Sequence, residues 1–256
     1  MKNHFLLPYS GNKRQEVEDI YKSIQHLITD DIKIIIEPYC GTFAFSFYLS
    51  SLFPKRFKYI LNDNNKYLID LINIAKDEDK LNELIEKLNI IINGINNKED
   101  YINIPEGIER YIIHNKWYNI HIGRYPNNDK CRNKTDFNYL KKCPVINFLR
   151  NEIYEIYNDN GVEIINQYKN DKNALIFIDP PYMQTCNDFY VNPSLNIYEY
   201  LYDNKIQLSN SIFIFCLENI WIVKMLFNKY KLLTIYDKKY SNHNSKKTTH
   251  AVYSNK

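Results

Sequence analysis

An apolar run over residues 174–178 leads directly into the segment Asp179-Pro180-Pro181-Tyr182. Such a run predicts a buried β-strand. Proline fixes its backbone φ at about −65° and has no N–H to donate, so two successive prolines end the strand and stiffen the turn. The segment therefore brings a carboxylate, backbone carbonyls and an aromatic ring to the rim of a sheet, where open α/β folds bind ligands. The same four residues also fit a simple turn or a Pro-Pro-Tyr ligand of a peptide-binding domain.

The first part of the chain alternates short β-branched runs with apolar residues at helical spacing. Strand–helix–strand–helix at this spacing is typical of βαβ units and a parallel sheet. The expected elements are strands over 32–36 and 57–61 and helices over 12–29, 43–52, 65–76 and 78–92.

The middle of the chain is less regular. Residues 93–105 are polar, 107–122 predict a helix, 123–142 have little periodicity, and 145–157 again have helical spacing.

After this region the alternation resumes. The expected elements are strands near 162–165, 174–178, 212–216, 232–236 and 248–253 and helices near 196–208 and 218–229. We therefore predict an α/β domain formed by residues 1–79 and 160–256. A mainly helical unit would be inserted over residues 80–159.

Three turns carry residues suited to ligand binding. Gly41 lets the backbone approach a ligand at the start of a helix. Asp63 ends the second strand, close to where nucleotide-binding α/β folds place an acid for ribose hydroxyls. Lys13 supplies a cation after a tight N-terminal turn. Each residue also has an ordinary interpretation, as a turn glycine, a helix cap and a solvated charge.

Taken in order, these segments resemble the Dam-type (D12 class) adenine-N6 DNA methyltransferases. The last stretch, residues 250–255, is similar to the closing strand of that family. The resemblance implies a Rossmann-like, S-adenosylmethionine-dependent methyltransferase sheet with an inserted target-recognition domain. The segments that carry it are Pro8-Tyr9-Ser10-Gly11-Asn12-Lys13, Glu37-Pro38-Tyr39-Cys40-Gly41-Thr42, Asn62-Asp63 and Asp179-Pro180-Pro181-Tyr182.

Two positions depart from the family pattern. Phe43 stands where the family commonly has a second glycine, and Asn12 where many relatives have glycine. A Phe43 side chain pointing inward would crowd the cofactor. We expect it to face the core with Phe47 instead.

The resemblance implies methyl transfer from S-adenosylmethionine, giving S-adenosylhomocysteine, to an adenine flipped out of double-stranded DNA. Asp179 would accept one N6–H bond and the Pro180 carbonyl the other, while Tyr182 would stack on the base. No metal is required. The implied catalytic residues are Asp179, Pro180, Pro181 and Tyr182, and the implied cofactor contacts are Tyr9, Lys13, Glu37, Pro38, Gly41, Asp63 and Asp179.

The net charge of +3 is too small to indicate a nucleic-acid partner by itself, but basic residues gather in two segments. They are residues 124–142 of the insert and residues 231–256, which hold six lysines against one acid. Either segment could follow phosphates or be a solvated loop. In the insert, the predicted DNA contacts are Arg124, Lys130, Arg132 and Lys134.

The five cysteines are widely spaced and contain no Cys-x-x-Cys pair. They predict reduced thiols in an intracellular compartment, the cytoplasm or another that holds DNA. The histidines show no zinc-ligand spacing with these cysteines, so we expect no metal site.

No apolar run approaches the roughly 20 residues that span a bilayer, so we expect a soluble protein.

Three other functions remain open. An RNA adenine methyltransferase could use the same catalytic turn. A glutamine methyltransferase of the related Asn-Pro-Pro-Tyr type is disfavoured because Asp179 comes first here. A degenerate relative that binds nucleic acid without cofactor is motivated by Phe43 and Asn12.

Overall fold

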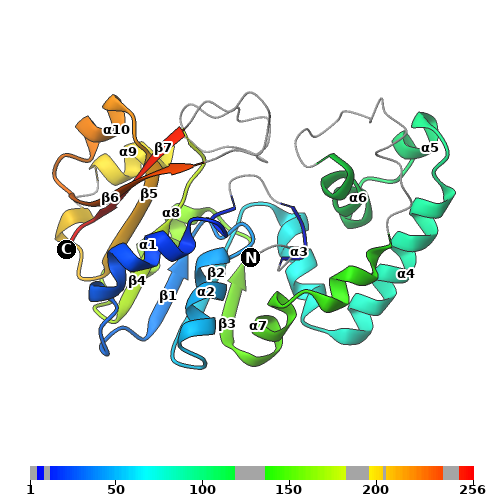
Figure 1. Ribbon diagram of the computed structural model, residues 1–256, viewed down its shortest axis with the longest axis horizontal. Coiled ribbons are helices and arrows are strands. Elements are labelled where there is room, and N and C mark those ends of the chain that lie inside the picture. Colours follow the sequence, from blue (N-terminus) through cyan, green and yellow to red (C-terminus); the bar gives the residue numbers. More distant parts are fainter. Residues whose placement is uncertain (1–4, 9–11, 119–135, 183–195, 204–205, 239–247) are drawn as a thin grey trace.

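A computed structural model describes residues 5–8, 12–118, 136–182, 196–203, 206–238 and 248–256. Its centre is a seven-stranded sheet with the strand order β3-β2-β1-β4-β5-β7-β6 (Figure 1). The first five strands in this order are parallel, and β7 runs antiparallel to both of its neighbours. The strands are β1 (Ile34–Glu37), β2 (Lys58–Asn62), β3 (Ile153–Tyr157), β4 (Ala174–Ile178), β5 (Ile212–Glu218), β6 (Lys231–Lys238) and β7 (Thr248–Ser254).

Successive side chains of the central strands enter two separate cores because strand residues alternate between the faces of a sheet. In β1, Ile35 belongs to one core and Ile36 to the other. In β4, Phe177 and Ile178 divide in the same way. Since both faces are covered, these strands are apolar along most of their length, as expected for a buried parallel sheet.

Helices cover both faces of the sheet and give three layers (Figure 1). One face carries α1 (Val17–Ile24), α2 (Ala44–Leu52), α3 (Lys66–Ala75) and α7 (Val145–Asn151), with the 3₁₀ turn η1 (Gln25–Leu27) after α1. The other carries α8 (Gly161–Tyr168), α9 (Asn196–Asp203) and α10 (Trp221–Leu226), with the 3₁₀ turn η5 (Ile206–Leu208) between the last two.

A group of helices extends from the β3 end of the sheet, beyond α3 (Figure 1). It contains α4 (Glu78–Gly94), α5 (Lys98–Ile102), α6 (Ile108–Tyr118) and the 3₁₀ helix η3 (Phe137–Lys142). The side chain of Asp77 caps α4, because it accepts hydrogen bonds from the backbone N–H groups of Asp79 and Lys80. The apolar side of α4 packs on α3 and joins the same core as one face of the sheet.

Two of the expected elements are wrong. The helix expected over 145–157 ends at Asn151, and residues 153–157 form strand β3. Ile153-Tyr154-Glu155-Ile156-Tyr157 is rich in β-branched and aromatic residues, and this preference outweighs the helical spacing of its two isoleucines. The strand expected near 162–165 lies in α8, whose first turn is capped by Asn160.

The other expected strands and helices of the described residues are present, with ends shifted by a few residues. The fold class is therefore confirmed as a mixed α/β sheet flanked by helices. Strand β3 pairs with β2 along its whole length, so residues 153–157 belong to the sheet although we assigned them to the insert. The division into separate units over 1–79 with 160–256 and 80–159 stays a prediction.

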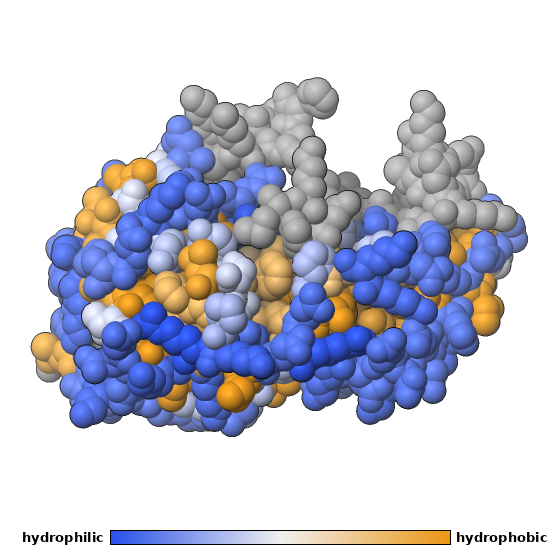
Figure 2. Space-filling view, turned by 60° about the horizontal axis from the view of Figure 1, so that its bottom comes forward, coloured by the Kyte–Doolittle hydropathy of each residue, from blue (hydrophilic) through white to orange (hydrophobic). Residues whose placement is uncertain are grey.

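The molecular surface is mainly hydrophilic on the face shown in Figure 2, where hydrophobic residues form patches between hydrophilic ones. The exposed large apolar side chains come from several elements and include Ile90 on α4, Ile153 on β3 and Trp221 on α10. Single exposed apolar side chains of this kind are normal for a folded domain.

Candidate active site

The carboxyl ends of the parallel strands meet at one edge of the sheet. The register pairs Glu37 of β1 with Leu61 of β2, and Asn62 of β2 with Tyr157 of β3. Strand β4 lies on the other side of β1 and ends immediately before Asp179. This edge therefore gathers residues from four separate stretches of sequence, in the place where open α/β sheets bind ligands.

Asp179 is held by two partners at this edge. The ammonium of Lys13 lies 2.6 Å from its Oδ2, and the Tyr182 hydroxyl donates to its Oδ1 at 2.8 Å. Lys13 is only 3% exposed. Burial alone would lower the pKa of Lys13, but the Asp179 carboxylate, with Cys216 and Glu16, raises it above its ordinary value. The site therefore holds a charged lysine against the carboxylate at the end of β4.

Tyr182 packs into the protein beside Asp179. The residue is 3% exposed, and the Lys13 ammonium lies 5.0 Å from the ring centroid. Burial and the neighbouring Asp179 raise the pKa of Tyr182 well above its usual value. The hydroxyl consequently stays protonated and can donate a hydrogen bond to the carboxylate.

Glu37, at the end of β1, is a second buried acid. The backbone N–H of Ser46 in the first turn of α2 donates to its Oε1 at 2.8 Å. Burial raises the pKa of Glu37 to about 8, with a smaller increase from Asp179, although the contacts with Ser46 oppose the shift. At neutral pH the carboxyl is therefore mostly protonated.

Asp63 fixes the loop that follows β1 to the end of β2. Its Oδ2 accepts from the Gly41 N–H and its Oδ1 from the Asn65 N–H, each at 2.9 Å. Gly41 has φ 48°, a left-handed conformation that glycine adopts readily. Burial raises the pKa of Asp63, and the two N–H donors oppose this rise. Gly41 and Asp63, which we expected to act in one site, are in direct contact.

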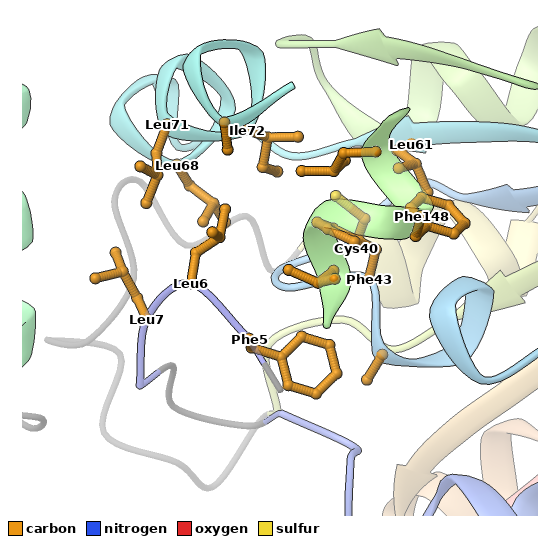
Figure 3. Packing of buried hydrophobic residues seen from close by; sticks show 14 of the residues in the cluster. Phe5, Leu6, Leu7, Cys40, Phe43, Leu61, Leu68, Leu71, Ile72 and Phe148 are labelled. Carbon is orange, nitrogen blue, oxygen red and sulfur yellow. The ribbon is translucent and has the colours of Figure 1, made fainter. Parts of the chain in front are cut away.

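Phe43 has the backbone conformation usually reserved for glycine, with φ 44° and ψ 43°. Its side chain is 2% exposed and stacks on Phe148 with ring centroids 5.3 Å apart, inside the core (Figure 3). Phe47 also packs against Phe148. The expectation that Phe43 faces the core is therefore confirmed. The strain of a left-handed non-glycine residue, of order 1–3 kcal/mol, is offset by this packing.

Asn12 links the N-terminal turn to the loop after β1. Its amide contacts the Thr42 hydroxyl, and its Oδ1 accepts from the Arg14 N–H at 2.7 Å. A glycine at this position would make neither contact. Both departures from the family pattern thus have a structural role.

The segment after β3 also belongs to this edge, and our reading of the sequence missed it. Asn158 donates to the Asp63 carbonyl at 2.8 Å, and the Asp159 N–H donates to the Asn62 side chain at 2.9 Å. A Cβ on Gly161 would lie 2.5 Å from the Tyr39 ring, so only glycine allows this close packing. The signal was Asn158-Asp159-Asn160-Gly161 directly after a β-branched run, but we had assigned that run to a helix.

The structure describes only some of the remaining predicted site residues. The Pro38 carbonyl accepts from the Asn62 amide at 2.8 Å, and Pro180 and Pro181 connect Asp179 to Tyr182. Outside the described residues lie Tyr9, Arg124, Lys130, Arg132 and Lys134.

The described ranges contain neither a candidate metal centre nor a candidate membrane-spanning helix. No group of three His, Cys, Asp or Glu side chains there could hold a metal ion. In the same ranges no helix has the length and apolar character needed to cross a bilayer. The free cysteines that the structure describes, Cys40, Cys143 and Cys216, are all buried.

The sheet order and the polar edge are consistent with an α/β methyltransferase fold. The family model of the D12 class N6 adenine-specific DNA methyltransferases matches residues 9–211, most of the chain. The chain belongs to this family, whose members methylate adenine N6 at specific sites in DNA. Membership implies the use of S-adenosylmethionine. No curated protein matches the chain.

Proposed function

We propose that this enzyme transfers the methyl group of S-adenosylmethionine to N6 of an adenine flipped out of double-stranded DNA. The observation that carries the proposal is Asp179, which ends β4 with Lys13 on one carboxylate oxygen and Tyr182 on the other. Family membership supplies the reaction. The geometry of the edge supports the roles of individual residues.

The loop after β1 and the ends of β2 and β3 suit the cofactor. The Asp63 carboxylate is fixed by two backbone donors and keeps lone pairs that could accept ribose hydroxyls. The Tyr39 hydroxyl is buried and has no hydrogen-bond partner among the described residues. Such a hydroxyl gains from a bound polar ligand. These observations support binding by Lys13, Glu37, Pro38, Gly41 and Asp63, with Tyr9 added from the family resemblance.

S-adenosylmethionine supplies an electrophilic methyl group on its sulfonium. The protein must make the adenine N6 a better nucleophile, because its lone pair is delocalised into the ring. Lys13 keeps Asp179 paired with a positive charge at neutral pH. Asp179 would accept one N6–H and the Pro180 carbonyl the other, which draws the nitrogen toward tetrahedral geometry. Catalysis is then orientation and electrostatic preorganisation.

Tyr182 would stack on the flipped base. Two prolines fix its distance from Asp179 along the chain, and the hydroxyl contact fixes the ring against that carboxylate. Because the residue is 3% exposed, stacking requires the side chains around it to shift when the base enters.

The DNA would be held by basic residues of the insert. Target adenines are inaccessible inside a duplex, so a protein that flips them must grip the flanking phosphates. In this proposal the contacts are Arg124, Lys130, Arg132 and Lys134. The lysines of residues 231–256 are the second candidate.

The test is methyl transfer by the purified protein from tritiated S-adenosylmethionine. The substrates are DNA free of adenine methylation, the same DNA as single strands, and duplex RNA. We expect label on adenine N6 of duplex DNA and the same rate with and without a chelator. A preference for RNA would contradict the choice of acceptor. Activity lost with the chelator and restored by a divalent ion would contradict metal-independent transfer.

A further inference from the structure

His250 lies beneath the Asp179–Tyr182 turn, on strand β7. It is fully buried, and its register partners are Glu218 on β5 and Tyr236 on β6. Its ring makes edge contacts with two tyrosines. The ring centroids are 4.8 Å from Tyr182 at an interplanar angle of 75° and 5.6 Å from Tyr236 at 66°.

In the contact between His250 and Tyr182, the imidazole is the donor and the hydroxyl oxygen is the acceptor. A tyrosine hydroxyl has one proton and two lone pairs. That proton goes to Asp179 Oδ1 at 2.8 Å, so the hydroxyl oxygen can only accept from His250 Nδ1, which lies 3.4 Å away. The separation is at the long end for a hydrogen bond. The hydrogen bonds therefore run from His250 as donor to the Tyr182 hydroxyl, and from that hydroxyl to the Asp179 carboxylate.

We propose that His250 is a positioning residue for methyl transfer, acting through the Tyr182 hydroxyl on the ring and on Asp179. The inference rests on the proposed roles of those two residues. A base that stacks on a ring and donates to a carboxylate needs both groups at a fixed separation, and small displacements cost rate. The two prolines constrain the backbone of the turn, and His250 constrains the side chain that ends it.

The two direct tests are His250→Phe and His250→Asn. The first keeps a ring and removes the nitrogen, whereas the second places an amide nitrogen near the position of Nδ1. Single-turnover methylation of duplex DNA should fall by about fivefold in His250→Phe, the size expected for one neutral hydrogen bond. It should stay within about twofold in His250→Asn. The dissociation constant for S-adenosylmethionine should not change in either.

Combining His250→Phe with Tyr182→Phe provides the readout that a purely structural role would not give. If His250 acts through the hydroxyl, the double variant is no slower than the slower single variant. Two losses that multiply, to about 25-fold, would overturn the proposal because they would mean independent action. His250→Phe with the parent rate would also overturn it.

A matched control lies on α6. His114 Nδ1 is 2.6 Å from the Tyr101 hydroxyl, in a buried pair formed between α5 and α6. His114→Phe should lower the thermal midpoint and keep the single-turnover rate. An equal loss of rate at both histidines would overturn the proposal, since it would indicate a general loss of stability.

If His250→Phe does not fold, His250→Gln takes its place, because its amide reaches the position of Nε2 and not of Nδ1.

These outcomes are separable from failure of the proposed function. The parent's rate on duplex DNA tests the proposed function. Only the ratios of variant to parent, measured on whichever nucleic acid the parent methylates, test His250.

Discussion

Among the described residues, two buried tyrosine–histidine pairs with a hydroxyl-to-ring-nitrogen contact lie in different regions of the molecule. In the helical group, Tyr101 of α5 meets His114 of α6 at 2.6 Å. At the carboxyl edge of the sheet, Tyr182 meets His250 of β7 at 3.4 Å, and its hydroxyl also donates to Asp179. The better hydrogen bond by distance is thus in the helical group. The pair joined to a charged network is at the edge of the sheet.

The difference shows that a contact gains a functional meaning from what it is connected to. Around Tyr101 the charged group is Arg110, whose guanidinium lies 5.8 Å from the ring centroid. Around Tyr182, Asp179 and Lys13 form an ion pair at the ends of parallel strands. We therefore expect substitutions at the edge to change chemistry and those in the helical group to change stability or DNA affinity.

Asp179→Ala should reduce methyl transfer by about a thousandfold or more, because it removes the proposed N6 acceptor and leaves Lys13 buried without its carboxylate. Single-turnover labelling of duplex DNA measures the effect. Asp171→Ala is the matched control, since Asp171 precedes the other end of β4, where it accepts from the Asn173 N–H. A similar loss in both variants would show that any weakening of β4 stops the reaction.

Tyr182→Ala should reduce the rate by about a hundredfold, because stacking needs the ring. Tyr182→Phe keeps the ring and loses only the hydroxyl contacts, so it should lose about fivefold. The ratio of the two losses, measured in the same single-turnover assay, separates stacking from hydrogen bonding. Equal damage from Phe and Ala would contradict the stacking role.

The carboxyl edge was largely predictable because its residues occur in short, ordered motifs. Gly41 and Asp63 follow predicted strands, and parallel strands bring their carboxyl ends together whatever lies between them. The contact between these two residues and the pairing of Lys13 with Asp179 agree with that reasoning.

The parts that were missed depend on long-range pairing. Strand β3 has apolar residues at helical spacing and becomes a strand because β2 offers it a parallel partner. With β3 misassigned, the loop from Asn158 to Gly161 could not be placed beside Asp63. His250 is 68 residues from Tyr182 in sequence, and no spacing rule connects the two. Such contacts follow from strand order, which local patterns do not encode.

Replacing Arg124, Lys130, Arg132 and Lys134 together with Ala should weaken DNA binding at least about tenfold while leaving affinity for S-adenosylmethionine unchanged. Each lost phosphate contact should lower the slope of log affinity against log salt by about one unit. A residue that reads a base edge would instead relax sequence choice, at a cost of roughly 1–3 kcal/mol. Titrations of a cognate and a scrambled duplex at several salt concentrations separate these outcomes.

The control for this variant replaces Lys33 and Lys172, which precede β1 and β4 at the opposite edge of the sheet. Their loss should change the salt slope far less. If the quadruple variant binds both duplexes like the parent at every salt concentration, the insert does not contact DNA. The lysines of residues 231–256 would then be the better candidates.

The smallest effect concerns Glu37, whose pKa rises from an ordinary 4.5 to about 8 on burial. The folded state therefore holds a proton that the unfolded state has released, and the free energy of unfolding should fall as pH rises through this window. Between pH 7 and pH 8 the expected fall is about 1 kcal/mol. Glu37→Gln has no such titrating proton and should remove this dependence of the free energy of unfolding on pH, as measured by urea unfolding at each pH.

The control is Glu86→Gln, on the exposed side of α4, which should keep the parent's pH dependence. A Glu37→Gln variant with the parent's pH dependence would show that the buried acid at the end of β1 is ionised in the folded protein.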